Sequence, residues 1–151
     1  MLEEGLDIVR AMWSGSAYRH HGPHYDVEIE DAPPEPHRIP IWMAGSNANP
    51  GVLARAAGCD GIYFNPEDHE ATPDEVAAVV AGLRRADLPI DAAFDVAVRG
   101  NASSAWPDPE PKNVDLAGLA EAGATWWMEA LIYFDPLGMS LDVVDAGPPG
   151  G

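Results

Sequence analysis

Short apolar segments alternate with helical segments along most of this chain, and the alternation restricts the possible folds more than any other feature. The apolar segments span residues 39–44, 60–64, 92–99 and 124–132. Strands that are apolar on both faces are typical of a parallel sheet covered by helices. The sequence therefore predicts an α/β fold in which four parallel strands follow one another in that order, with helices on the outer face of the sheet.

Capping residues indicate where the helices between these strands begin and end. Asn49 and Pro50 suit the start of a helix that ends near Gly58. Thr72 to Glu75 has the form of a capping box with proline at the first helical position. Other elements are expected as a helix over residues 2–14 closed by Gly15, a hairpin arm at Val27 and Ile29 ended by Pro33, Pro34 and Pro36, a short helix with Leu116 and Leu119 that stops at Gly123, and one helical turn over 141–144.

Two architectures fit this order of elements, a doubly wound open sheet and part of a (β/α)₈ barrel. No Gly-x-Gly-x-x-Gly run follows the first predicted strand, which weakens the dinucleotide-binding version of the open sheet. A full barrel needs roughly 250 residues, whereas this chain has 151. The chain also begins inside a predicted helix, so we expect residues 1–151 to be a truncated barrel domain.

Composition excludes several classes of partner. The net charge of -17 and the isoelectric point near 4.3 disfavour binding to nucleic acids or to anionic membrane surfaces. The single cysteine, Cys59, cannot form an intrachain disulfide, and the chain shows no signal peptide or long apolar run, so a cytoplasmic protein is expected. An anionic cofactor stays possible, because backbone N–H groups at a helix start can bind a phosphate.

A set of short motifs, in a fixed order, resembles a known family. The motifs are Leu2-Glu3-Glu4-Gly5-Leu6, Met12-Trp13-Ser14-Gly15, His24-Tyr25, Ile41-Trp42-Met43-Ala44-Gly45, Ala56-Ala57 with Asp60-Gly61, Thr72-Pro73-Asp74-Glu75, and Ala122-Gly123-Ala124-Thr125-Trp126-Trp127-Met128-Glu129. Together they resemble the second half of the luciferase-like monooxygenases, which are flavin- or deazaflavin-dependent oxidoreductases. The closing Gly147-Pro148-Pro149 is similar to the usual ending of that family.

The resemblance implies that the four predicted strands are strands five to eight of a TIM-like (β/α)₈ barrel. It implies FMN or coenzyme F420 at the carboxyl ends of the strands, and electron transfer to oxygen or hydride transfer to a small-molecule substrate. The first half of the barrel, which supplies much of the flavin pocket in such enzymes, would be absent. We therefore expect the chain alone to bind cofactor weakly or not at all, and to be inactive.

The turn formed by Ala44, Gly45, Ser46 and Asn47 is the candidate cofactor-binding site. It lies between a predicted strand end and a predicted helix start, where free N–H groups and the helix dipole favour an anion. The resemblance also places cofactor phosphate near this turn. The alternative is an ordinary strand-to-helix loop whose Gly45 and Asn49 serve turn geometry.

Glu129 is the candidate catalytic residue. It lies late in the fourth predicted strand, near the rim where barrel enzymes carry out their chemistry. A carboxylate there needs a partner if it is buried, and it could act as a general acid or base or contact the substrate. The alternative is an ion pair with Arg99 on the neighbouring strand.

Two further groups of residues have a functional and a structural interpretation. His20, His21, His24 and Asp26 have the residue types of a zinc site, but no second cluster supplies further ligands, so no metal is expected. Trp126 and Trp127 point to opposite sides of their strand, and for both side chains packing in the core is favoured over stacking on a flavin.

The sequence is compatible with three kinds of protein. The first is a fragment of a flavin-dependent oxidoreductase that lacks its N-terminal half. The second is a half barrel that forms a homodimer, because four open strands leave two unpaired edges and an apolar interior. The third is a non-enzymatic remnant that has kept its packing and lost its cofactor.

Overall fold

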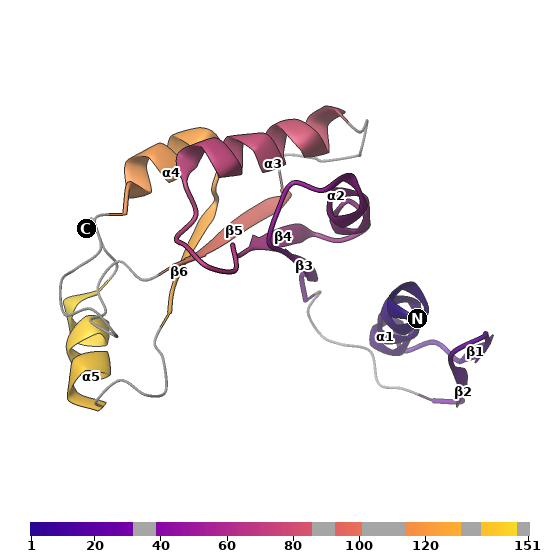
Figure 1. Cartoon of the computed structure of the whole chain (residues 1–151). Helices are drawn as coiled ribbons and strands as arrows, with labels where there is room; N and C mark the ends of the chain where they lie inside the picture. The colour runs from indigo at the N-terminus through magenta and orange to yellow at the C-terminus, as the bar shows by residue number, and fades with distance from the viewer. Residues whose placement is uncertain (32–38, 86–92, 101–113, 131–136, 148–151) are drawn as a thin grey trace. The chain divides into compact units, whose positions relative to one another are not determined.

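The structure is a computed structural model that describes residues 1–31, 39–85, 93–100, 114–130 and 137–147 (Figure 1). The chain divides into two units, Met1–Ile39 and Pro40–Gly151. No helix in the described ranges combines the length and the apolar character that a membrane span requires.

The first unit consists of one helix and one hairpin. Helix α1 (Leu2–Ser14) ends at Gly15, which has a left-handed φ of 69°. Strands β1 (Tyr18–His21) and β2 (Asp26–Ile29) are antiparallel, and Tyr18 lies opposite Ile29. The helix over residues 2–14 and the hairpin arm were both predicted, and both are confirmed. The prolines expected to end the hairpin lie outside the described residues.

The second unit contains a four-stranded parallel sheet. Its strands are β3 (Trp42–Gly45), β4 (Gly61–Phe64), β5 (Asp95–Gly100) and β6 (Trp126–Glu129), and they lie side by side in that order. The predicted fold class, strand direction and strand order are therefore confirmed. The strands start one to three residues later than predicted, and the last two residues of the predicted 124–132 segment lie outside the described ranges.

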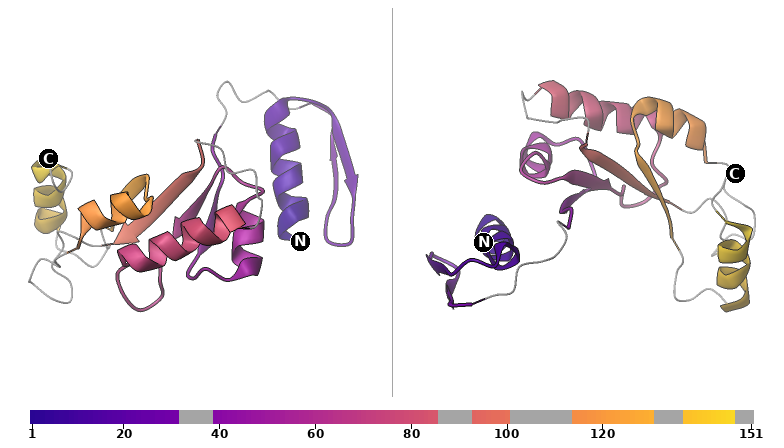
Figure 2. Two further views of the ribbon diagram at one scale, coloured as in Figure 1. Left: turned by 90° about the horizontal axis from the view of Figure 1, so that it is seen from above. Right: turned by 180° about the vertical axis from the view of Figure 1, so that it is seen from behind.

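Three helices of this unit lie on one face of the sheet, as Figures 1 and 2 show: α2 (Pro50–Ala56), α3 (Pro73–Arg85) and α4 (Leu116–Ala122). The predicted capping box starts α3, since the Thr72 N–H donates to Glu75 Oε2 (2.9 Å) and the Glu75 N–H donates to Thr72 Oγ1 (3.3 Å). Gly123, with a φ of 111°, ends α4. Helix α5 (Leu137–Ala146) is longer than the single turn predicted over 141–144.

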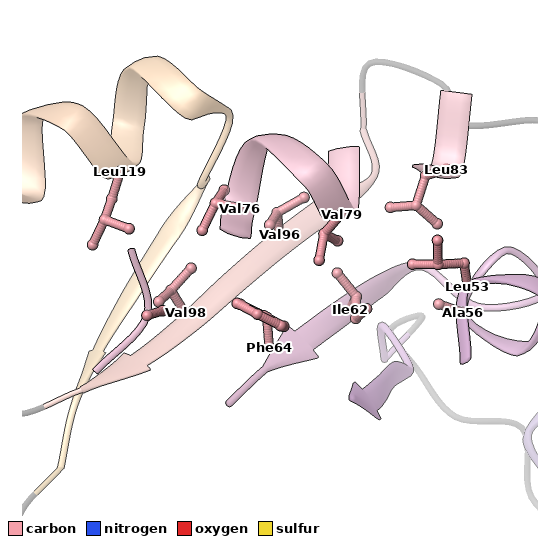
Figure 3. Packing of buried hydrophobic residues seen from close by; sticks show 11 residues of the cluster. Leu53, Ala56, Ile62, Phe64, Val76, Val79, Leu83, Val96, Val98 and Leu119 are labelled. Atoms are coloured by element: carbon pink, nitrogen blue, oxygen red, sulfur yellow. The ribbon is translucent and has the colours of Figure 1, made fainter. Parts of the chain in front are cut away.

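The hydrophobic core lies between the sheet and these three helices (Figure 3). Ile62, Phe64 and Val98 project from the strands into the same buried cluster as Val79 and Leu83 of α3, and all five are at most 1% exposed. Burying an aliphatic or aromatic side chain of this size contributes roughly 1.5–3 kcal/mol. Because alternate strand residues point to opposite faces, the remaining strand residues must project away from the helices.

That second surface, which we call the open face, consists of Trp42, Ala44, Tyr63, Asp95, Ala97, Arg99, Trp126 and Met128 by the register of the four strands. Trp126 is 53% exposed and Met128 is 41% exposed. A sheet covered by helices on one face, with large apolar side chains on the other, is the arrangement of strands in part of a β/α barrel.

Candidate cofactor and substrate site

The carboxyl ends of the four strands form one edge of the sheet. The residues next to this edge are Ser46 after β3, Asn65 after β4, and Arg99 and Glu129 near the ends of β5 and β6. Barrel enzymes place their ligands at this edge, because the loops that follow the strands meet there. The residues that the sequence singled out for cofactor binding and for catalysis thus share one end of the sheet.

Position 45 requires a glycine because β3 packs closely on α2. A β-carbon at this position would lie 2.6 Å from Cγ1 of Val52. Gly45 is not among the described glycines that have a positive φ. Turn geometry therefore does not account for this glycine, and packing against Val52 does. A larger residue at position 45 would force Val52 to shift, whether or not a ligand were bound.

The first turn of α2 offers few free donors, contrary to the expectation from its sequence. Pro50 has no N–H group, and the Gly51 N–H donates to Asn49 Oδ1 at 2.9 Å. The N–H groups of Val52 and Leu53 both donate to the carbonyl oxygen of Asn49. Asn49 thus caps the helix and occupies the donors that a phosphate would otherwise take.

The loop before α2 retains donors of its own. Within the described ranges, the backbone N–H groups of Asn47 and Ala48 have no acceptor. The Ser46 hydroxyl donates to Glu67 Oε1 at 3.4 Å, a long hydrogen bond between two strand-to-helix loops. An anion at this loop could accept from these three groups, although the Glu67 carboxylate would repel it unless that side chain moved.

Arg99 lies on the open face at the carboxyl edge of the sheet. Its Nη1 is 3.5 Å from Oδ1 of Asn65, the first residue after β4. Asn65 is itself fixed, because its backbone N–H donates to the carbonyl oxygen of Gly45 at 2.9 Å. Among the described residues, no carboxylate forms an ion pair with Arg99.

Glu129 and Arg99 lie on opposite faces of the sheet. Glu129 is in register with Gly100, whereas Arg99 is in register with Met128. The Trp127 indole Nε1–H donates to Glu129 Oε2 at 2.9 Å, so the two side chains share the face that carries the helices. The ion pair with Arg99 that was the alternative for Glu129 is therefore not formed. Both Glu129 and Trp127 line a pocket of about 620 Å³ beside α4.

The histidines of the hairpin divide between two carboxylates. His20 Nε2 lies 2.9 Å from Glu4 Oε1, and His21 Nδ1 lies 2.6 Å from Asp26 Oδ1. The hydrogen bond from His20 is the main cause that lowers the pKa of Glu4 below its usual value. In the part of the chain that the structure describes, no three His, Cys, Asp or Glu side chains are arranged to hold a metal ion.

Trp126 and Trp127 project to opposite faces, as their sequence positions predicted. Trp127 packs against the hydrophobic core, whereas the Trp126 indole Nε1–H donates to Asp95 Oδ1 at 2.8 Å on the open face. Sequence reasoning missed Asp95, and it did not place Arg99 beside Asn65. The available signal was the alternation of Asp95, Ala97 and Arg99, which puts two charged residues on one face of an otherwise apolar strand.

Comparison with known proteins agrees with this geometry. A family model described as luciferase-like monooxygenase matches residues 1–122. Uncharacterized proteins of Mycobacterium bovis and of two strains of Mycobacterium tuberculosis are each 33% identical to this chain over 87 residues. The matched segment covers 56% of this chain and 27% of the length of each relative. No solved structure gives a significant match.

Proposed function

Because this chain belongs to the luciferase-like monooxygenase family, we propose that it forms part of a flavin-dependent oxidoreductase that acts on a small-molecule substrate. The observation that carries the proposal is the open face of the sheet, where Trp126 and Met128 are exposed. A face of this kind suits the interior of a (β/α)₈ barrel. This proposal requires the other strands of the barrel to come from a further segment of polypeptide.

The proposed cofactor is FMN or coenzyme F420, held by the loop from Ala44 to Asn47. The backbone N–H groups of Asn47 and Ala48 and the hydroxyl of Ser46 are the donors that a phosphate group could use. When bound, such a cofactor supplies the electron or hydride transfer, while the protein supplies binding, orientation and electrostatics. The capped first turn of α2 supports a role for the loop itself and not for the helix dipole.

Glu129 remains the predicted general acid or base of the reaction. Glu129 lines a pocket that extends along β6 and α4, and its carboxylate accepts a hydrogen bond from the Trp127 indole. Glu129→Gln keeps a side-chain oxygen for that bond and removes the titrating group. We expect this variant to fold normally. In a completed barrel, meaning this chain together with the polypeptide that supplies the other strands, it should lose the acid or base limb of the pH–rate profile. An unchanged profile would assign Glu129 a structural role.

The cofactor proposal is tested by adding a negative charge to the loop. Ser46→Asp places a second carboxylate beside Glu67, which should weaken the binding of phosphate-bearing FMN or F420 by at least about tenfold in a completed barrel. Ala78→Asp makes the same charge change on an exposed position of α3 and serves as the control. Equal cofactor affinity in both variants would remove the loop from the cofactor site.

A second possibility is that the open face is covered by another copy of this chain. The exposed Trp126 and Met128 favour it, since large exposed apolar patches mark interaction surfaces. Two such sheets of four strands would supply the eight strands of a closed barrel. Measuring the mass of the chain in solution separates a dimer from a monomer that requires a different partner segment.

A further inference from the structure

We propose that Arg99 and Asn65 bind a carboxylate group of the substrate at the carboxyl edge of the open face. The inference rests on the proposed function, because it takes the open face as the interior of an enzyme's barrel. It adds a class of substrate to that function, namely small molecules that carry a single carboxylate.

Most N–H donors of the Arg99 guanidinium have no acceptor among the described residues. A guanidinium group carries five N–H donors, and in the described ranges Arg99 has one acceptor, Asn65 Oδ1 at the long distance of 3.5 Å. The Asn65 amide uses its oxygen in this contact, so its NH₂ group is left to donate. A carboxylate bridging the two side chains would receive hydrogen bonds from a charged fork and a neutral amide.

The charge distribution of the unit makes this position distinctive. Its other described arginines are Arg55, at the end of α2, and Arg84 and Arg85, at the end of α3. Helices that follow strands in parallel β/α units run back toward the amino ends of the strands. These three arginines therefore lie at the opposite edge. Arg99 is the described arginine of this unit at the carboxyl edge, and His69, in the loop after β4, is already hydrogen-bonded to Asp68 and Glu75.

A monoanion fits the site better than a phosphate dianion. Arg99 and Asn65 together offer a single positive charge, and Glu67 and Glu70 lie in the loop that follows Asn65. Their negative charges oppose a doubly charged ligand more than a singly charged one. The planar fork of a guanidinium also matches the two oxygens of a carboxylate. Next to Arg99 along the open face, Met128 and Trp126 present apolar surface to the rest of such a ligand.

Titration of the full chain with benzoate tests the inference. The readouts are the NMR signals of the Arg99 Nε–H group and of the Trp126 indole N–H. Benzamide, which has the same ring without the charge, and inorganic phosphate are the comparison ligands. Arg99→Gln removes the guanidinium, Asn65→Asp adds a repelling carboxylate, and Arg84→Gln is a charge-matched control on α3.

We expect saturable benzoate binding that weakens at least about tenfold in Arg99→Gln and in Asn65→Asp and is unchanged in Arg84→Gln. Circular dichroism that shows cooperative unfolding of each variant excludes misfolding as the cause. Absence of saturable binding, equal binding by Arg99→Gln, or binding of phosphate or benzamide as tight as that of benzoate would overturn the inference.

Failure of the proposed function gives a different result. If a completed barrel binds neither FMN nor F420 while benzoate binding still depends on Arg99, the carboxylate site stands and the flavin proposal falls. If Arg99→Gln abolishes FMN binding but leaves benzoate binding intact, Arg99 belongs to the cofactor site and the carboxylate assignment is wrong.

Discussion

Gly61 leaves the space that the indole ring of Trp42 occupies on the open face. A β-carbon at Gly61 would lie 2.8 Å from Cδ1 of Trp42 and 2.6 Å from the carbonyl oxygen of Asp95. Across this gap the Trp42 Nε1–H donates to Asp95 Oδ2 at 3.1 Å. The ring reaches toward Trp126 of the other outer strand, with 5.9 Å between the ring centroids. On the open face these contacts link the two outer strands, β3 and β6, across the two inner strands.

Replacing Gly61 by alanine should destabilise the second unit. The added methyl group would meet backbone as well as the Trp42 ring, and overpacking of this kind costs about 1–3 kcal/mol. Gly58→Ala is the matched control, because a β-carbon there would be 3.6 Å from its nearest neighbour. Urea unfolding monitored by circular dichroism measures both variants, and equal midpoints would show that the Trp42 contact is not formed in solution.

Asp95→Ala should also lower the free energy of unfolding. The carboxylate accepts from Trp42 Nε1 and from Trp126 Nε1, so its loss leaves two indole donors without their acceptor. Because the site is partly exposed to water, we expect a loss of about 1–2 kcal/mol. Asp142→Ala, at an exposed position of α5, controls for the change in net charge. Tryptophan fluorescence should shift in the Asp95 variant, and a spectrum and stability like those of the control would argue against the bridge.

Local sequence signals were sufficient to predict most of the fold. The capping box at Thr72 and the glycines at 15 and 123 ended or began helices where expected, because these positions depend on hydrogen bonds between near neighbours. The parallel order of the strands followed from the alternation of elements and the short connections. Strand ends were less accurate, since register depends on contacts between distant segments.

The candidate site was harder to predict, because its geometry is set across strands. The residues next to Gly45 in the sequence do not indicate that a β-carbon at position 45 would lie 2.6 Å from Cγ1 of Val52. The assignment of Asn49 as a cap already implied that its side chain accepts from the first turn of α2, which conflicts with the anion site expected at the same donors. The faces of Glu129 and Arg99 depend on the register of β5 with β6, which a one-residue shift would reverse.

The stability of the α3 start should depend on pH through His69. Hydrogen bonds to Asp68 and then to Glu75, each 2.8 Å long, raise the pKa of His69 above its usual value. The hydrogen bond from His69 in turn lowers the pKa of Asp68. Burial opposes the shift at Glu75, but hydrogen bonds from Thr72 and His69 lower its pKa overall.

A raised histidine pKa contributes stability that is complete below its ordinary value of 6.5 and is lost as pH rises through the raised value. The lowered carboxyl pKa values contribute stability above their ordinary values of 3.8 and 4.5, which is lost as pH falls through the lowered values. We therefore expect the largest contribution between about pH 4.5 and 6.5. NMR titration of His69 should give a pKa that falls in Glu75→Gln. An unshifted pKa in the unsubstituted chain would contradict the cluster.

Met128→Lys should reduce self-association of the chain. Met128 is exposed on the open face, and a charge there opposes burial against a second copy or against another apolar surface. Ala78→Lys, on the exposed side of α3, adds the same charge away from the open face. Multi-angle light scattering across a concentration series should show dimers or larger species for the unsubstituted chain and for the control, and a smaller mean mass for Met128→Lys. Identical masses for all three would place any association elsewhere.

Cofactor titration with and without the complementary strands tests the central claim most directly. The fluorescence of FMN and of F420 would be followed as each is titrated with the chain alone, and with the chain co-expressed with the part of a Mycobacterium tuberculosis relative that lies outside the matched segment. We expect weak or no binding by the chain alone and saturable binding by the complex, because the pocket for the ring system requires surfaces from both sides of the barrel. Tight binding by the chain alone, or no binding of either cofactor by a complex that light scattering shows to be assembled, would contradict the assignment of this sheet as part of a flavin-binding barrel.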